Sequence, residues 1–132
     1  MSQENVDVVR SLLAAFDRGD YEAALALIDP DVEWAEPPYL PGSGVQRGHE
    51  GIRRGWARWL AEWEWFNVEP VEVIDAGDRV MVHGTNRARG RASGVEVTRQ
   101  FGSVFTVRAG KVLRHEAFAT KAEALEAVGL SE

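Results

Sequence analysis

One histidine and one carboxylate are the residues of this chain most suited to acid-base chemistry. His115 follows Leu113 and precedes Ala117 on one side of a predicted strand. An imidazole near its ordinary pKa can exchange protons close to neutrality. Glu36 lies on the same side of the segment "DVEWAEP" as Trp34, where its carboxylate could orient or stabilise the imidazole. His115 and Glu36 are therefore the candidate catalytic residues.

Three further polar residues fall on strand faces that are otherwise apolar. Asn86 lies in the strand predicted over 80–88, and Arg99 and Ser103 interrupt the apolar side of the strand predicted over 95–108. A buried polar group without a partner costs about 1–3 kcal/mol. These residues therefore indicate either an internal hydrogen-bond network or a bound ligand.

Each polar residue also has a purely structural interpretation. A single inward-facing histidine such as His115 is more often a hydrogen-bonded packing residue than a catalyst. Glu36 could form a salt bridge with Arg99, or Arg99 could lie at the rim of a pocket and attract an anionic ligand. The residues alone leave both interpretations open.

Aromatic surface is concentrated in "RRGWARWLAEWEWF" at 53–66, which holds four of the five tryptophans. From Ile52 onward, Trp56, Trp59 and Trp63 share one helical stripe. We expect their indoles to form a helical wall beside a cavity, with at least one ring touching it. The alternative is that the stripe is simply core.

The elements that would position these residues follow from the periodicity. A first helix begins after Ser2, and a second includes Ile28 and ends at Pro30, which cannot continue it. The tryptophan helix begins at about His49. A last helix begins at Thr120, which forms a capping-box spacing with a glutamate three residues later.

The chain after Pro70 alternates between apolar and polar residues, with turn signals at "AGD", "ASG" and "RAG". Four successive antiparallel strands are expected, and helices followed by such a meander predict an α+β fold. Small inward residues at Gly84, Ala88 and Ala117 are expected to leave room for a pocket.

The outer face of the same sheet is half apolar. A face of this kind is too apolar for open solvent and too polar for a core, which predicts a homodimer. The residues expected on this outer face are Met81, Thr85, Val104, Val112 and Phe118.

Length and composition exclude several classes of function. The chain has 132 residues, a net charge of −6 and no cysteine. The acidic balance argues against nucleic acid and anionic membranes as partners, and the lack of cysteine excludes disulfides. We expect one domain over 1–132, a cytoplasmic location, no metal and no cofactor.

The chain as a whole resembles the SnoaL-like polyketide cyclase family of the nuclear transport factor 2-like (NTF2-like) superfamily. The resemblance is carried by "VEWAEPP", "GVQRGHEGIRRGW", "DRVMVHGTNRARGRASGVEV", "FGSVFTVRAGKVLRHEAF" and "KAEALEAVGL". It implies a cone-shaped α+β barrel with N-terminal helices packed on a curved, mostly antiparallel sheet. It also implies a pocket on the concave face and, frequently, a homodimer.

Activities in this superfamily include ring closure, epoxide hydrolysis, steroid isomerisation, scaffolding and ligand binding, so the fold does not decide the function. Trp34 and Glu36 stand where hydrolase relatives have a tyrosine and an asparagine. Gly84 and Asn86 replace an arginine and an aspartate, and Ala117 replaces the acid-base aspartate of the last strand. The best-known catalytic groups of these relatives are therefore absent here.

Two classes of function remain open on this basis. One is a cofactor-independent lyase, isomerase or hydrolase that acts on a small apolar substrate through His115 and Glu36. The other is a non-catalytic module that binds a hydrophobic ligand, or a dimeric scaffold. The expected ligand contacts are Trp34, Tyr39, Trp56, Trp59, Trp63, Val82, Asn86, Arg99, Phe101, Ser103 and Ala117.

Overall fold

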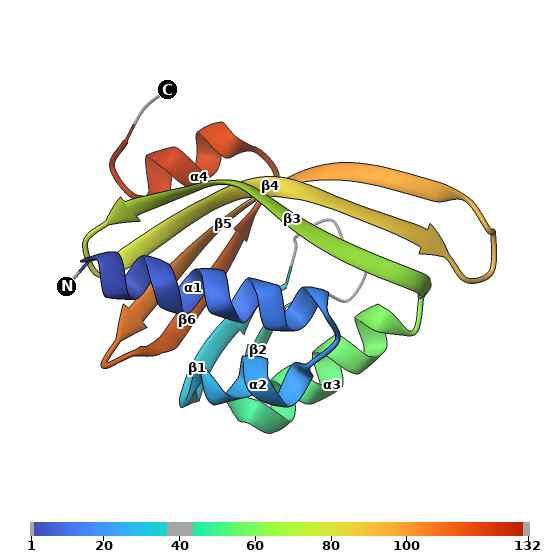
Figure 1. The fold of residues 1–132 in the computed structure, drawn as a ribbon, viewed down its shortest axis with the longest axis horizontal. Coiled ribbons are helices and arrows are strands. Elements are labelled where there is room, and N and C mark those ends of the chain that lie inside the picture. The colour runs from blue at the N-terminus through green and yellow to red at the C-terminus, as the bar shows by residue number, and fades with distance from the viewer. Residues whose placement is uncertain (1, 37–43, 131–132) are drawn as a thin grey trace.

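The computed structural model describes residues 2–36 and 44–130 (Figure 1). The helices are α1 (Ser2–Asp17), α2 (Tyr21–Ala26), α3 (Gly48–Leu60) and α4 (Lys121–Ala127). The strands are β1 (Ile28–Ala35), β2 (Val45–Arg47), β3 (Trp63–Ala76), β4 (Arg79–Gly90), β5 (Glu96–Arg108) and β6 (Lys111–Phe118).

The strands form one curved sheet in the order β2-β1-β6-β5-β4-β3. All neighbours are antiparallel except β1 and β6, which run parallel. In Figure 1, α1, α2 and α3 lie against one face of the sheet and α4 lies against the other. The predicted α+β class and the mostly antiparallel curved sheet are confirmed.

The main core lies between the inner face of the sheet and the N-terminal helices. Val9 and Leu12 of α1, Ile52 of α3 and Phe105 of β5 are each no more than 1% exposed. Full burial of a side chain of this size contributes about 1.5–3 kcal/mol. The apolar residues that recur at helical spacing in α1 are thus the side of the helix that packs on the concave face of the sheet.

A second core lies on the outer face, where α4 packs against the sheet. Met81 and Val104 are fully buried there with Leu125 and Ala124 of α4. The side chain of Thr120 accepts a hydrogen bond from the amide of the third residue of the helix, as the capping-box spacing predicts.

This packing corrects the apolar outer face predicted from the sequence. Met81 and Val104 are covered by α4 of the same chain, and Phe118 packs beside them. Val112 belongs to the inner core instead, because the register of β5 and β6 shifts between Thr106 and Val107. These residues therefore provide no argument for a dimer.

Two predicted element ends are wrong. The second helix ends at Ala26, and Ile28 already begins β1, which carries Pro30. The tryptophan helix ends at Leu60, and Trp63 begins β3. The β-branched and aromatic residues after Trp63 pair along the length of β4, and this pairing outweighs the helical spacing.

Gly84 does not leave the empty volume that was expected. A Cβ atom at this position would lie 2.5 Å from the carbonyl oxygen of Glu69 and 2.8 Å from the ring of Phe101. The ring of Phe101 therefore fills the space above the glycine. Gly84 allows this close approach and does not enlarge the pocket.

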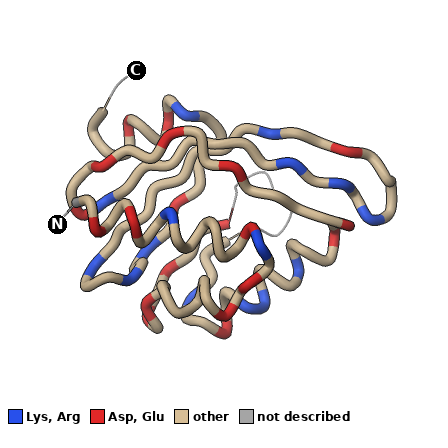
Figure 2. Tube along the Cα trace, viewed as in Figure 1, with Lys and Arg blue, Asp and Glu red and all other residues tan. Residues whose placement is uncertain are grey.

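Charged residues are interspersed along the elements (Figure 2). Of the arginines at the outer end of β4, Arg89 pairs with Glu64 and Glu96, and Arg91 donates to backbone carbonyls of 61 and 63. No helix in the described part of the chain is long and apolar enough to cross a membrane.

Candidate functional site

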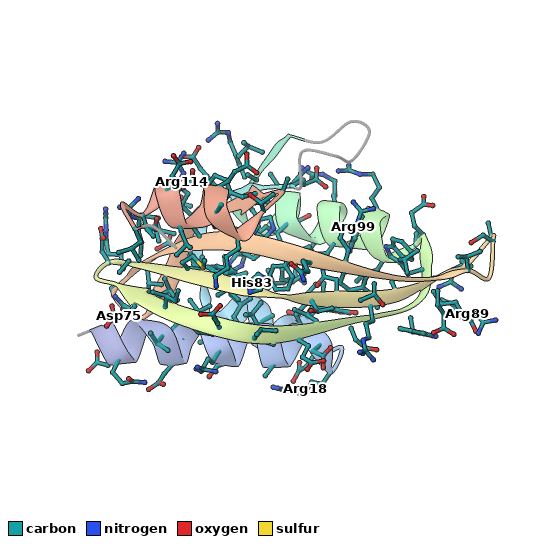
Figure 3. The ribbon with its side chains drawn as sticks, turned by 90° about the horizontal axis from the view of Figure 1, so that it is seen from above. Arg18, Asp75, His83, Arg89, Arg99 and Arg114 are labelled. Carbon is teal, nitrogen blue, oxygen red and sulfur yellow. The ribbon has the colours of Figure 1, made fainter. Side chains whose placement is uncertain are left out.

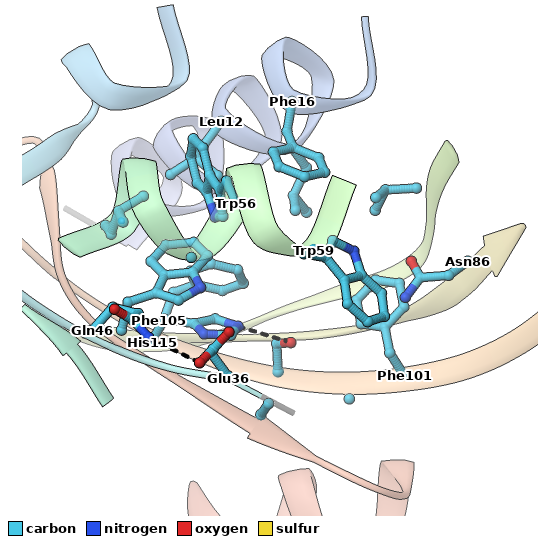
Figure 4. A pocket seen from close by; sticks show the side chains of 18 of the residues that line it. Leu12, Phe16, Glu36, Gln46, Trp56, Trp59, Asn86, Phe101, Phe105 and His115 are labelled. Carbon is cyan, nitrogen blue, oxygen red and sulfur yellow. Dashed lines mark hydrogen bonds between the residues drawn. The ribbon is translucent and has the colours of Figure 1, made fainter. Parts of the chain in front are cut away.

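A cavity of about 150 Å³, here called the first cavity, lies between α1, α3 and the inner face of the sheet. Much of its wall is aromatic. The aromatic lining residues are Phe16, Trp34, Trp56, Trp59, Phe66, Phe101, Phe105, Phe118 and the imidazole of His115. In Figure 4, Glu36, Gln46 and His115 lie toward one end of this cavity and Asn86 lies toward the other.

His115 is held by two hydrogen bonds at the wall of the first cavity. Its Nδ1 lies 3.0 Å from the carbonyl oxygen of Ala35, and its Nε2 lies 3.2 Å from Oγ of Ser103. Because a carbonyl can only accept, Nδ1 carries the proton. In the neutral ring, Nε2 then accepts the Ser103 hydroxyl proton, so both nitrogens have protein partners.

Burial lowers the pKa of His115 from 6.5 to about 4, and the bond to the Ala35 carbonyl opposes this shift in part. The ring is only 8% exposed and stacks on Trp34 with centroids 4.1 Å apart and planes 20° apart. Phe105 lies on a further side, 4.9 Å away between centroids. The imidazole is therefore neutral at pH 7.

The stack of Trp34 on His115 follows from the parallel pairing of β1 with β6. Trp34 and His115 are direct register partners in that pair. Residues opposite each other on neighbouring strands point to the same face, so the two rings meet on the concave side. Trp34 also contacts Trp56 of α3 edge to face, at 5.7 Å between centroids.

Glu36 also lines the first cavity, and its side chain is 9% exposed. Arg58 of α3 donates to both carboxylate oxygens, at 2.7 and 2.8 Å, and Gln46 of β2 donates to one of them at 2.9 Å. Glu36 therefore forms an ion pair with Arg58, a partner that the sequence did not suggest. The carboxylate thus accepts hydrogen bonds from two elements, and Arg58 supplies the compensating charge.

Glycines on α3 allow Gln46 to reach Glu36. A Cβ atom at Gly55 would lie 3.1 Å from the Gln46 side chain, and one at Gly51 would lie 3.5 Å from its backbone. Both glycines are buried. The spacing of four residues places them on one face of the helix, which lets β2 approach closely.

A second cavity of about 190 Å³ is lined by residues from the end of α3 and from β3, β4 and β5. Its lining residues are Trp59, Trp63, Phe66, Asn86, Ala88, Val97 and Arg99. Trp59, Phe66 and Asn86 also line the first cavity. Figure 3 shows Arg99 beside α3.

The structure brings most of the expected site residues to these two cavities. The first is lined by His115, Glu36, Trp34, Trp56, Trp59, Asn86, Phe101, Ser103 and Ala117, and the second by Trp59, Trp63, Asn86 and Arg99. Val82 lines neither and is fully buried in the core. Tyr39 lies outside the described residues.

Sequence reasoning missed Arg58, Gln46 and Phe105. Arg58 lies off the tryptophan stripe, and its guanidinium donates to Glu36. The sequence signal that could have predicted the contact with Gln46 was the pair Gly51 and Gly55 of α3, because two glycines on one helix face allow another segment to approach closely. Among the described residues, no group of three or more histidine or acidic side chains could hold a metal ion.

The family model described as "SnoaL-like domain" matches residues 9–115. An NTF2-like protein from Burkholderia thailandensis E264 is 32% identical, with a TM-score of 0.79, over 90% of this chain and 95% of its own. An NTF2-like protein of unknown function from Burkholderia pseudomallei K96243 is 26% identical, with a TM-score of 0.82, over 95% and 97%.

TerC co-crystallised with polyporic acid is 29% identical to this chain, with a TM-score of 0.81, over 96% of this chain and 98% of its own. No curated protein matches the sequence. The comparisons therefore rest on the family model and on solved structures of the same fold.

Proposed function

Because the chain belongs to the SnoaL-like domain family, we propose that it binds a small, largely aromatic molecule in the first cavity. The observation that carries this proposal is the composition of the wall. Indole and phenyl rings from α1, α3 and the sheet surround a space of about 150 Å³, and the polar groups lie near its ends. Sites for flat apolar ligands have this composition.

Ligand binding is favoured over proton transfer because both candidate catalytic groups are already engaged. His115 uses one nitrogen on Ala35 and the other on Ser103. Glu36 is held by Arg58 and Gln46. A general base is most effective with a pKa near the working pH, and the pKa of His115 is lowered to about 4.

The similarity to TerC supports an aromatic ligand and supplies a probe. TerC was co-crystallised with polyporic acid and shares the fold over nearly its full length. We therefore choose polyporic acid as one probe and biphenyl as a second, purely apolar one.

Isothermal titration calorimetry with both probes tests the proposal. At least one should bind the wild-type protein, and Ala117→Phe should abolish that binding because the ring fills the cavity that Ala117 lines. Ala57→Phe is the matched control, since Ala57 is exposed on α3 and lines neither cavity. Absence of binding by both probes, or equal binding by both variants, would refute the proposal.

A second candidate function is acid-base catalysis at the same cavity. The contact of 3.2 Å between His115 Nε2 and Ser103 Oγ favours it, because a substrate hydroxyl could replace the serine hydroxyl there. In that case His115→Gln should abolish turnover while the protein remains folded. Retained turnover in this variant would exclude His115 as the acid-base group.

A homodimer and a cytoplasmic location, both expected from the sequence, stay predictions. The family resemblance supports the dimer, but Met81, Val104 and Phe118 of the predicted outer face pack in the core that α4 covers. Sedimentation at micromolar concentration decides the point. A single species near 14.6 kDa would exclude the dimer.

A further inference from the structure

The first cavity alone has room for about one aromatic ring. A dry cavity of roughly 150 Å³ holds one benzene molecule, and the first cavity measures about 150 Å³. The second cavity, of about 190 Å³, shares Trp59, Phe66 and Asn86 with the first. The second cavity therefore adjoins the first, and it is the space into which we expect the second ring of a two-ring ligand to extend.

Two residues that line the second cavity each carry a buried polar atom without a hydrogen-bond partner among the described residues. Nε1 of Trp63 and Oδ1 of Asn86 are buried, and neither has a hydrogen-bond partner within the described part of the chain. Both residues line this cavity. Buried polar atoms are nearly always paired in folded proteins, so an unpaired donor and an unpaired acceptor on one cavity indicate a missing partner.

The chemistry of the two atoms selects the missing group. An indole N–H can only donate, and an amide oxygen can only accept. A hydroxyl group within reach of both atoms would satisfy both, because its oxygen can accept from Trp63 while its proton is donated to Asn86. A carboxylate would satisfy Trp63 but would place an acceptor against the Asn86 oxygen. Arg99 also lines this cavity, so a carboxylate is the rival to be tested.

We propose that Trp63 and Asn86 form a hydroxyl-recognition subsite at the outer end of the ligand site. The preferred ligands are then aromatic hydroxyl compounds of two rings. One ring lies in the first cavity and the hydroxyl-bearing ring lies in the second. This inference rests on the proposed function, because it takes the first cavity to be the place where the ligand body binds.

Three matched ligands test the subsite: biphenyl, 4-phenylphenol and biphenyl-4-carboxylate. Their dissociation constants are measured by calorimetry on the wild-type protein at one pH. One net hydrogen bond corresponds to roughly a 3- to 10-fold change in affinity. We expect 4-phenylphenol to bind about 10-fold more tightly than biphenyl, and more tightly than the carboxylate.

Two variants assign the effect to the proposed residues. Trp63→Phe removes the N–H and keeps an aromatic ring, and Asn86→Leu removes the acceptor and keeps a similar volume. Each should lower the advantage of 4-phenylphenol over biphenyl by about 3-fold or more while biphenyl still binds. Trp65→Phe is the matched control, since Trp65 is exposed and lines neither cavity. This control variant should leave the ratio of the two dissociation constants unchanged.

The ratio of the dissociation constants of biphenyl and 4-phenylphenol on the same protein separates this effect from a loss of folding, because misfolding weakens the binding of both ligands. Biphenyl and 4-phenylphenol binding equally well to the wild type would overturn the subsite and leave the proposed function intact. Tighter binding of biphenyl-4-carboxylate would replace the hydroxyl site with an anion site at Arg99. Failure of all three ligands and of polyporic acid to bind would refute the proposed function, and the subsite with it.

Discussion

The neutral His115 predicts a specific loss of stability in mild acid. The folded protein holds the pKa of this ring at about 4, whereas the unfolded value is 6.5. The unfolded chain therefore binds the proton more readily. The stability that this group contributes is complete above pH 6.5 and falls as the pH drops toward 4.

The size of the loss follows from the two pKa values. One pKa unit corresponds to about 1.4 kcal/mol, so a fall from 6.5 to about 4 corresponds to a loss of about 3 kcal/mol. Between pH 7.5 and pH 5.0 the expected loss from His115 is about 2 kcal/mol. This amount is large beside the free energy of unfolding of an ordinary domain, about 5–15 kcal/mol.

Urea unfolding followed by circular dichroism measures the loss at both pH values. His115→Asn has no titrating ring but retains a nitrogen that can donate to Ala35. The variant is expected to be less stable at pH 7.5, because it loses the stack on Trp34. Between the two pH values it should lose about 2 kcal/mol less than the wild type. Equal losses in the two proteins would refute the reasoning, as would an NMR titration of His115 near pH 6.5.

Two further predictions concern packing, and both are measured by urea unfolding at pH 7.5. Gly84→Ala should destabilise the protein by about 1–3 kcal/mol, because its Cβ would overlap the Phe101 ring and a backbone oxygen; Gly44→Ala, where a Cβ meets nothing within 4 Å, should change little. Leu125→Ala should cost about 2–5 kcal/mol, whereas the same change at Leu130, which is 40% exposed, should cost far less. Similar effects within either pair would contradict the packing described for Gly84 or for α4.

Local patterns were sufficient to predict most of the sheet. The alternation in β4 places Val80, Val82, Gly84 and Ala88 on one face, and all four are buried. Each residue is assigned to the inner face from one fact alone, which is that successive side chains of a strand point to opposite faces of the sheet. The same reasoning identified His115 and Ala117 as inward residues of β6.

Assignments that depend on a distant partner could not be made in this way. The β1–β6 pairing joins residues about 80 positions apart, and only this pairing places Trp34 on His115. The inward turn of Val112 depends on a register shift with β5. Trp63 keeps a helical spacing, yet it lies in a strand because β4 offers a partner along its length. Nothing within these short segments specifies those partners.

The same distinction explains what the sequence could say about the candidate site. Residue type and strand face were enough to bring His115 and Glu36 to the cavity wall, but they did not show which hydrogen bonds would already be made. The partners of both residues come from other elements, and they occupy the atoms that proton transfer would need. Among the described residues that line the two cavities, Trp63 and Asn86 retain buried polar atoms with no hydrogen-bond partner. We therefore expect ligand recognition to involve Trp63 and Asn86 of the second cavity more than His115 and Glu36.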